Sequence, residues 1–247
     1  MGFFNALGDY AEALRLVSKL KLWVYFLIPS LISLFVGAGI IFVMISLGDN
    51  FGLWLGGLYP FDWGAEWAIR ISQWLGYLLM AIMALFLFRY IIIIFLAPVL
   101  SPLSLKVEKY LSDGQIDNSW SIGQLFREIR RSLRINIRNL LRELMFTLFL
   151  FLLHFIPVIG WFSSIFIFLV QAYYSGFGNM DFTLERHLGY RQSISFVRAN
   201  RSMAIGNGAI FILMLMIPVL GLLFTPPLAV VAATLGTVKS LKEARLY

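Results

Sequence analysis

The hydrophobic positions of the chain form runs of different length, and the longest runs predict membrane-spanning helices. Residues 22–47 contain no charged side chain, and residues 74–100 contain only Arg89. At about 1.5 Å per residue, each run is long enough to cross a hydrocarbon core of roughly 30 Å. Residues 3–20 instead place apolar side chains at spacings of three and four, which is typical of an amphipathic helix on the membrane surface.

Two later apolar stretches are each interrupted by a turn signal. Residues 144–178 contain Ile-Pro-Val-Ile-Gly and residues 203–238 contain Ile-Pro-Val-Leu-Gly, so the two signals differ at one position. Each half-stretch reaches only about 20 Å, which is too short to cross the membrane alone. Proline and glycine three residues apart predict a turn, here at Pro157 and Gly160 and at Pro218 and Gly221. Two partly penetrating helical hairpins or two kinked full spans fit this pattern.

The charge distribution favours the hairpins. Lys and Arg near the ends of spans favour the cytoplasmic side. Basic residues gather before residue 22, in 101–143, in the connector 179–202 and after residue 238, and these segments hold every Lys and Arg except Arg70 and Arg89. All of them can lie on one side only if both hairpins return to the side they left. We therefore expect one main orientation and a single membrane domain over residues 1–247, with two long transmembrane helices, two hairpins and amphipathic surface helices, all of it α-helical.

Composition supports a membrane protein and excludes several other classes. The 247 residues are 60% hydrophobic and 13% charged, whereas soluble chains carry about 25% charged residues. A soluble enzyme and a disordered chain are both excluded. The chain has no cysteine, so it can form no disulfide and no thiolate site. We expect no catalytic residue, no metal and no cofactor, and the chain has no phosphate-binding loop of the kind that ATP-driven motors use.

The segment before the first hairpin carries a stripe of arginines beside an apolar face. The apolar face comprises Phe126, Ile129, Leu133, Ile137, Leu140 and Leu144, and the stripe comprises Arg127, Arg131, Arg134, Arg138 and Arg142. A pI near 9.8 and a net charge of +7 also fit nucleic-acid binding. We do not expect nucleic acid as a partner, because the stripe lies against the bilayer without aromatic stacking partners. Anionic lipid headgroups are one candidate partner, and an anion pathway with Arg131 and Arg134 at its mouth is the other.

Further candidates for anion binding lie elsewhere in the chain. After each predicted turn a short helix begins near membrane depth, and its free N–H groups and positive dipole end favour an anion. Ser163 and Ser164 add hydroxyl groups after the first turn, and Thr225 adds one after the second. These hydroxyls can equally satisfy backbone groups at a kink. Arg89 either extends to the cytoplasmic interface or faces inward to a carboxylate or an anion.

The order of these parts resembles the CysZ sulfate permease family, which is grouped with the etoposide-induced membrane proteins of eukaryotes. The resemblance covers most of the chain from about Leu14. It rests on Tyr25-Phe26-Leu27-Ile28-Pro29, Ala97-Pro98 followed by Lys106-Val107-Glu108, Arg131-Ser132-Leu133-Arg134, Phe155-Ile156-Pro157-Val158-Ile159-Gly160, residues 181–187 and Met216-Ile217-Pro218. It implies an oligomeric, multi-pass protein of the bacterial inner membrane that takes up sulfate passively for cysteine synthesis.

One segment departs from that family. Its sulfate permeases carry Gly-x-Arg-Arg just before the first span, where this chain has Lys21-Leu22-Trp23-Val24. Lys19 and Lys21 are the nearest cations, and a lysine lacks the bidentate fork of arginine. Two functional hypotheses follow. The first is a passive channel or permease for sulfate or another small oxyanion, and the second is a non-transport membrane protein that binds anionic lipid or acts as a scaffold.

Overall fold

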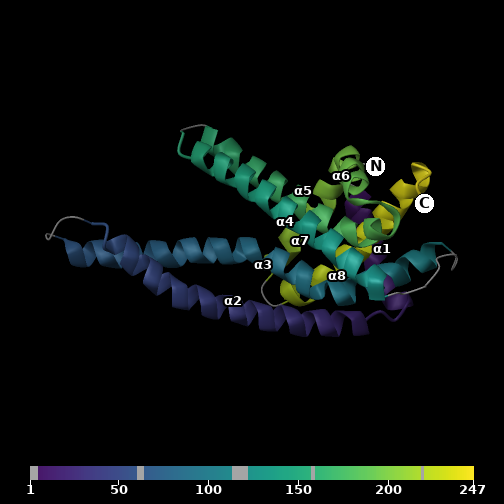
Figure 1. The fold of residues 1–247 in the computed structure, drawn as a ribbon, viewed down its shortest axis with the longest axis horizontal. Coiled ribbons are helices and arrows are strands. Elements are labelled where there is room, and N and C mark those ends of the chain that lie inside the picture. The colour runs from purple at the N-terminus through teal and green to yellow at the C-terminus, as the bar shows by residue number, and fades with distance from the viewer. Residues whose placement is uncertain (1–4, 60–63, 113–121, 157–158, 218–219) are drawn as a thin grey trace. The chain divides into compact units, whose positions relative to one another are not determined.

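The structure, a computed structural model, describes residues 5–59, 64–112, 122–156, 159–217 and 220–247, and these ranges are helical with no strand (Figure 1). This confirms an all-α membrane protein. The helices are α1 (Asn5–Lys19), α2 (Val24–Gly56), α3 (Ala65–Leu111), α4 (Ile122–Leu153), α5 (Ile159–His187), α6 (Tyr190–Ala199), α7 (Arg201–Leu215) and α8 (Leu220–Glu243). They divide into two compact units, residues 31–95 and the remainder of the chain.

The smaller unit is a pair of helices that contact each other through glycine. A Cβ atom added to Gly52 would meet the backbone of Gln73, and one added to Gly76 would meet the backbone of Gly48 and Gly52. Gly56 continues the same face, with Ile69 opposite. Small residues let helix backbones approach closely in a membrane. We call Gly48, Gly52, Gly56 and Gly76 the glycine seam.

The outer surface of this pair is apolar. The segments Leu34–Gly56 and Ala65–Ala84 are long and apolar enough to cross a membrane, and only 6% of each is buried inside the protein. Trp67 and Trp74 are among the exposed side chains. A helix that is apolar on all sides and exposed needs lipid around it.

The core of the larger unit is built on α8. The apolar segment Leu223–Glu243 resembles a spanning helix in composition, but 83% of it is buried inside the protein. Helices α1, α5 and α7 all contact α8. Many of its buried side chains are small or β-branched, as in the run Ala229–Ala233, and buried leucines such as Leu235 fill the space between the neighbouring helices.

Helices α5 and α7 cross at very short range. A Cβ atom on Gly176 would collide with the carbonyl oxygen of Ala204, and one on Gly208 would collide with that of Ala172. Only glycine fits at these two positions, so the crossing is fixed by the sequence. The side chains of Phe177, Met180 and Leu184 on α5 extend the apolar core toward α4, where Ile135 packs against them.

Both predicted turns lie between paired helices, α4 with α5 and α7 with α8. The structure merges two predicted parts, because α4 runs without interruption through residue 143 into the first hairpin. It also turns part of the apolar face of α4 outward: Leu133, Ile137 and Leu144 are exposed, and Ile135, Asn136 and Asn139 are buried instead. The depth of both hairpins in the membrane stays a prediction.

Candidate functional site

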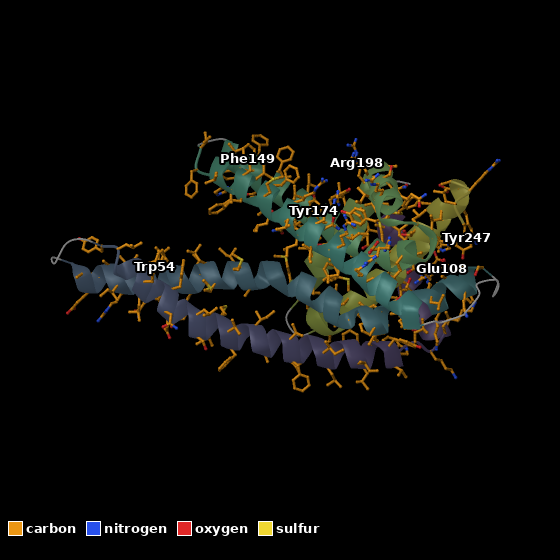
Figure 2. All side chains as sticks on the ribbon, viewed as in Figure 1. Trp54, Glu108, Phe149, Tyr174, Arg198 and Tyr247 are labelled. Carbon is orange, nitrogen blue, oxygen red and sulfur yellow. The ribbon has the colours of Figure 1, made fainter. Side chains whose placement is uncertain are left out.

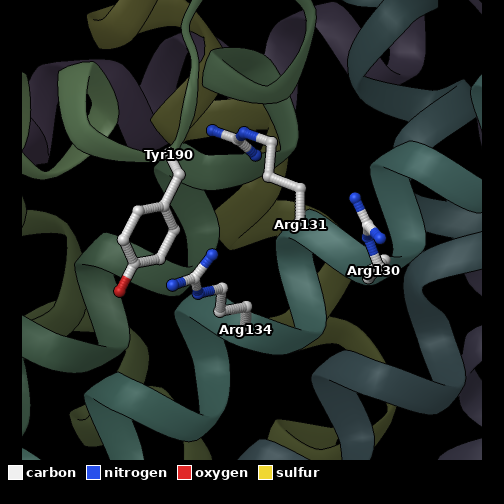
Figure 3. A pocket seen from close by; sticks show the side chains of 4 residues that line it. All are labelled: Arg130, Arg131, Arg134 and Tyr190. Atoms are coloured by element: carbon white, nitrogen blue, oxygen red, sulfur yellow. The ribbon is translucent and has the colours of Figure 1, made fainter.

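Three arginines and one tyrosine line an open pocket in the larger unit. Arg130, Arg131 and Arg134 come from one turn of α4, and Tyr190 is the first residue of α6 (Figure 3). The pocket has a volume of about 370 Å³, enough for a small oxyanion with water around it. Three guanidinium groups beside one cavity create a positive potential that attracts anions. Arginine also matches the oxygen geometry of oxyanions by donating two parallel hydrogen bonds.

Arg131 is anchored by the protein itself. Its guanidinium donates to Asp181 Oδ1 at 3.1 Å and to Ser193 Oγ at 2.5 Å, and its Nε donates to the carbonyl of Leu188 at 3.1 Å. Asp181, on α5, is only 2% exposed and also accepts a hydrogen bond from Ser132 at 3.0 Å. Burial raises the pKa of Asp181 above its ordinary value, and the charge of Arg131 opposes that rise. Arg131 therefore holds α4 to α5 at the base of the first hairpin.

The other two arginines keep their charge available. Arg134 lies over the ring of Tyr190, with 4.6 Å from its guanidinium carbon to the ring centre, a cation–π contact that orients the group without neutralising it. Arg130 and Arg134 are exposed, and neither forms an ion pair with a carboxylate in the described part of the chain. Among the described residues, the pocket thus holds two positive charges without a carboxylate partner beside the Arg131–Asp181 pair.

A second buried ionic cluster lies between α3 and α5 (Figure 2). Arg186 Nε donates to Glu108 Oε2 at 2.6 Å, and the His187 ring pairs with the other carboxylate oxygen of Glu108. Glu108 is completely buried. Burial acts to raise its pKa, but the hydrogen bond from His187 and the charges of Arg186 and His187 outweigh that effect and lower the pKa. The cluster is a satisfied structural contact that positions α5.

Lys19 and Lys21 lie at the junction of α1 and α2 and do not line the pocket. Lys19 Nζ donates to the Tyr110 hydroxyl at 2.6 Å and also lies over its ring. Lys21 is exposed and adopts a positive φ of 51° where α1 ends. Lys19 therefore joins α1 to α3, and Lys21 lies where the chain changes direction between α1 and α2. The side chain of Arg89, a further predicted candidate, lies outside the described residues.

The hydroxyls after the first turn are engaged by the turn itself. Ser163 donates to the carbonyl of Gly160 at 2.7 Å and lies 3.1 Å from His154 Nδ1. Ser164 makes longer contacts, of 3.5 Å, with the same two groups. Ser163 therefore forms hydrogen bonds with a backbone carbonyl and an imidazole. This is the second of the two roles predicted for these hydroxyls, the first being anion binding.

The second turn shows a related geometry. Gly160 N–H donates to the carbonyl of Ile156, and Gly221 N–H donates to that of Ile217, both at 2.9 Å. At either glycine a Cβ atom would collide with a carbonyl at the end of the preceding helix. Thr225 is completely buried, and its hydroxyl has no hydrogen-bond partner among the described residues. Pro157 and Pro218 lie outside the described residues.

A family model described as "Sulfate transporter CysZ/Etoposide-induced protein 2.4" matches residues 10–226. The chain belongs to this family. A protein named sulfate transporter CysZ from Pseudomonas fluorescens is 29% identical, over 92% of this chain and 90% of its own length. Similar proteins of the same name come from Pseudomonas paraeruginosa, 28% identical over 95% of both chains, and from Vibrio cholerae, 27% identical over 93% of this chain and 91% of its own. The resemblance inferred from the sequence is therefore confirmed.

The matched region includes the arginine pocket and both turn glycines. Sequence analysis identified Arg131 and Arg134, which the structure brings together, but it missed Arg130 and Tyr190. Arg130 directly precedes Arg131, and the two form one helical turn of basic residues with Arg134. The predicted stripe included only arginines spaced by three and four residues, so it left Arg130 out. Tyr190 is 56 residues away from Arg134 and had no local signal. His187 pairs with Glu108, a contact between α5 and α3 for which the sequence carries no local signal.

Proposed function

We propose that this protein carries sulfate passively across the bacterial inner membrane and that the pocket of Arg130, Arg131, Arg134 and Tyr190 is its anion-binding site. The observation that carries this proposal is that three arginines line one cavity and that two of them, Arg130 and Arg134, are exposed. The relatives named sulfate transporters support sulfate as the anion. With sulfate as the substrate, the biological role of the protein is to supply sulfate for sulfur assimilation.

The pocket suits binding followed by release. A transported ion must bind well enough to enter and weakly enough to leave. Arg131 is partly neutralised by Asp181, while Arg130 and Arg134 remain exposed to solvent, so the attraction is screened by water and salt. The pocket attracts a dianion without trapping it.

Uptake of radiolabelled sulfate into proteoliposomes tests the proposal, with empty liposomes as the blank and with phosphate and chloride as competitors. Arg134→Gln should raise the KM for sulfate about tenfold, the loss expected for one charge-assisted hydrogen bond of about 1.5 kcal/mol. Arg130→Gln should act in the same direction. Arg198→Gln is the matched control, because Arg198 is an exposed arginine on α6 outside the pocket. Unchanged sulfate uptake in both pocket variants would refute the site.

The same pocket also favours a second function, because the phosphate of a lipid headgroup offers similar oxygens to two exposed arginines. In that case the protein binds anionic lipid, or acts as a scaffold, without transporting anions. Vesicles with and without phosphatidylglycerol distinguish the two functions. Binding of the protein to anionic vesicles that is lost in Arg134→Gln, together with no flux of any anion, supports the lipid-binding function.

The one-sided charge distribution supports a multi-pass topology with the basic segments in the cytoplasm. The absence of native cysteine allows a direct test with single-cysteine variants and an impermeant thiol reagent. Gly57→Cys, between α2 and α3, should be labelled from outside intact cells without their outer membrane. Ala244→Cys, after α8, should be labelled only after the inner membrane is opened. Labelling of both from the same side would contradict this topology.

A further inference from the structure

The buried face of α4 carries a line of polar side chains. Asn136, Asn139, Glu143 and Thr147 follow one another at spacings of three and four residues, so they lie on one face of the helix. This face meets α5, the helix against which α4 packs. Asn139 and Glu143 are 0% exposed. A helix that enters a membrane normally buries small apolar residues against its partner, so polar groups at this interface require an explanation. We call this line the polar seam.

Several atoms of the polar seam have no partner in the protein. Among the described residues, Asn136 Oδ1, Asn139 Nδ2 and Thr147 Oγ1 are buried without a hydrogen bond. The other end of each amide is fixed, because Asn136 Nδ2 donates to the carbonyl of Ser132 and Asn139 Oδ1 accepts from Arg138. Each buried unsatisfied polar group is costly, and polar groups of this kind are normally bonded to protein or to water.

The chemistry of the free atoms matches water. Asn136 offers an acceptor, Asn139 a donor, and Thr147 a hydroxyl that can do both. A water molecule donates and accepts, so one file of water can satisfy all three in turn. A single ion cannot, because a cation would satisfy only the acceptors and an anion only the donors.

The charges beside the polar seam separate it from the arginine pocket. Ser132, one turn before Asn136, donates to Asp181, and Glu143 lies within the seam. Arg131 pairs with Asp181, and Arg138 donates to Asn139 beside Glu143, so the carboxylates and arginines along this line balance and leave no excess positive charge to hold sulfate. Asp181 is where the two features meet, because it accepts hydrogen bonds from Arg131 of the pocket and from Ser132 at the start of the seam.

We propose that the interface between α4 and α5 holds a file of water molecules that extends from Asp181 along the polar seam to Thr147. The first hairpin is then hydrated on its inner face while its outer face meets lipid. This inference goes beyond sulfate binding and does not depend on it, because the seam takes water and not the transported anion.

Single-cysteine variants of the full-length protein in liposomes test the proposal with water-soluble methanethiosulfonate reagents. Thr147→Cys is a small change, and Phe149→Cys is its matched control, because Phe149 lies two residues away on the exposed face. Thr147→Cys should react at least about tenfold faster, a difference of about 1.4 kcal/mol in the barrier. The cationic ethyltrimethylammonium reagent and the anionic ethylsulfonate reagent should both show this difference, after both are normalised to Ala244→Cys.

Asn139→Cys and its exposed control Leu141→Cys form a second, independent pair, so the test survives the loss of one variant. Equal labelling within both pairs, or slower labelling of the seam cysteines, overturns the proposal, because the interface is then dry or the whole hairpin is in water. Protection of Thr147→Cys by saturating sulfate also overturns it, because sulfate would then occupy the seam. A raised KM for sulfate in Arg134→Gln with seam labelling unchanged separates this proposal from the anion site.

Discussion

The two predicted hairpins have nearly the same turn sequence and opposite surroundings. Each turn glycine donates to the carbonyl of an isoleucine four residues earlier at 2.9 Å. The first hairpin nevertheless exposes large apolar side chains on both helices, including Trp161, which is 85% exposed, and Phe149 (Figure 2). In the second hairpin, α8 is enclosed by the other helices of its unit, and residues 225–238 are all buried.

The difference teaches that the turn motif sets the local path of the chain, while the size of the flanking side chains sets the environment. Phe and Leu dominate on both sides of the first turn, whereas 11 of the 24 residues of α8 are Ala, Gly, Val or Thr. In a membrane, small residues pack helix against helix, and bulky apolar residues can face lipid at no cost. Hydropathy alone does not distinguish these two cases.

The largest expected effect is at the base of the first hairpin. Arg131→Ala should lower the free energy of unfolding by about 3–5 kcal/mol, because it leaves the carboxylate of Asp181 buried without a counter-charge. Unfolding in mixed micelles, followed by tryptophan fluorescence, measures the loss. The double variant Arg131→Ala/Asp181→Asn should recover much of it, since the buried charge is gone. A loss below about 1 kcal/mol would show that the Arg131–Asp181 ion pair contributes little to stability.

Two leucines test the contrast between the hairpins directly. Leu235 on α8 is 0% exposed, and Leu148 on α4 is 57% exposed. Leu235→Ala should cost about 2–5 kcal/mol because it opens a cavity, whereas Leu148→Ala should change stability by less than about 0.5 kcal/mol. The same micelle unfolding assay compares them. Similar losses at both sites would mean that the first hairpin is packed against another surface, such as a second copy.

The turn glycines test what the hairpins share. Gly160→Ala and Gly221→Ala should each cost about 1–3 kcal/mol, because the new methyl group meets a backbone carbonyl that cannot move freely. Thermal unfolding monitored by circular dichroism is sufficient to compare them. Gly39→Ala is the control, since nothing lies within 4 Å of its added Cβ and alanine favours the helix by up to about 1 kcal/mol. A large loss of stability for only one of the two glycine variants would show that the two turns are not equivalent.

The smallest expected effect is on stability at acidic pH. The pKa of Glu108 is lowered in the folded protein, so the folded state binds its proton less readily than the unfolded state does. The contribution of Glu108 to stability is therefore full above its ordinary pKa of 4.5 and is lost as the pH falls through the lowered value. Residues 203–238 contain no Asp or Glu, so the second hairpin has no such dependence.

Hydrogen exchange at a series of pH values measures this difference. Below about pH 4.5, amides near residue 187 of α5 should lose protection before those of α8. Glu108→Gln should flatten that dependence, because it removes the titrating group. Simultaneous loss of protection in both helices, in the wild type and in Glu108→Gln alike, would contradict the assignment to Glu108.

The sequence was sufficient for the helical fold, for the breaks between α4 and α5 and between α7 and α8, and for two of the four residues that line the pocket, because these follow from hydropathy and from spacing along one helix. It was insufficient for the buried face of α4. The apolar residues Leu133 and Ile137 seemed to mark the packed side, but in a membrane protein an apolar face can point outward to lipid. It was also insufficient for Tyr190 and for the Glu108–His187 pair, since both depend on helices that meet only after folding.

The glycine seam of the smaller unit brings the backbones of α2 and α3 together at Gly52 and Gly76, while the side chains of Tyr77 and Ile69 lie against the other two glycines. Helices that pack through side-chain knobs are locked lengthwise, but backbone against backbone offers few such locks. Among the described residues, the hydrogen bond from the Tyr77 hydroxyl to Asp49 joins the two helices beside the seam. This phenol group therefore helps to hold α2 and α3 in register along their length, and Tyr77→Phe would remove that contact.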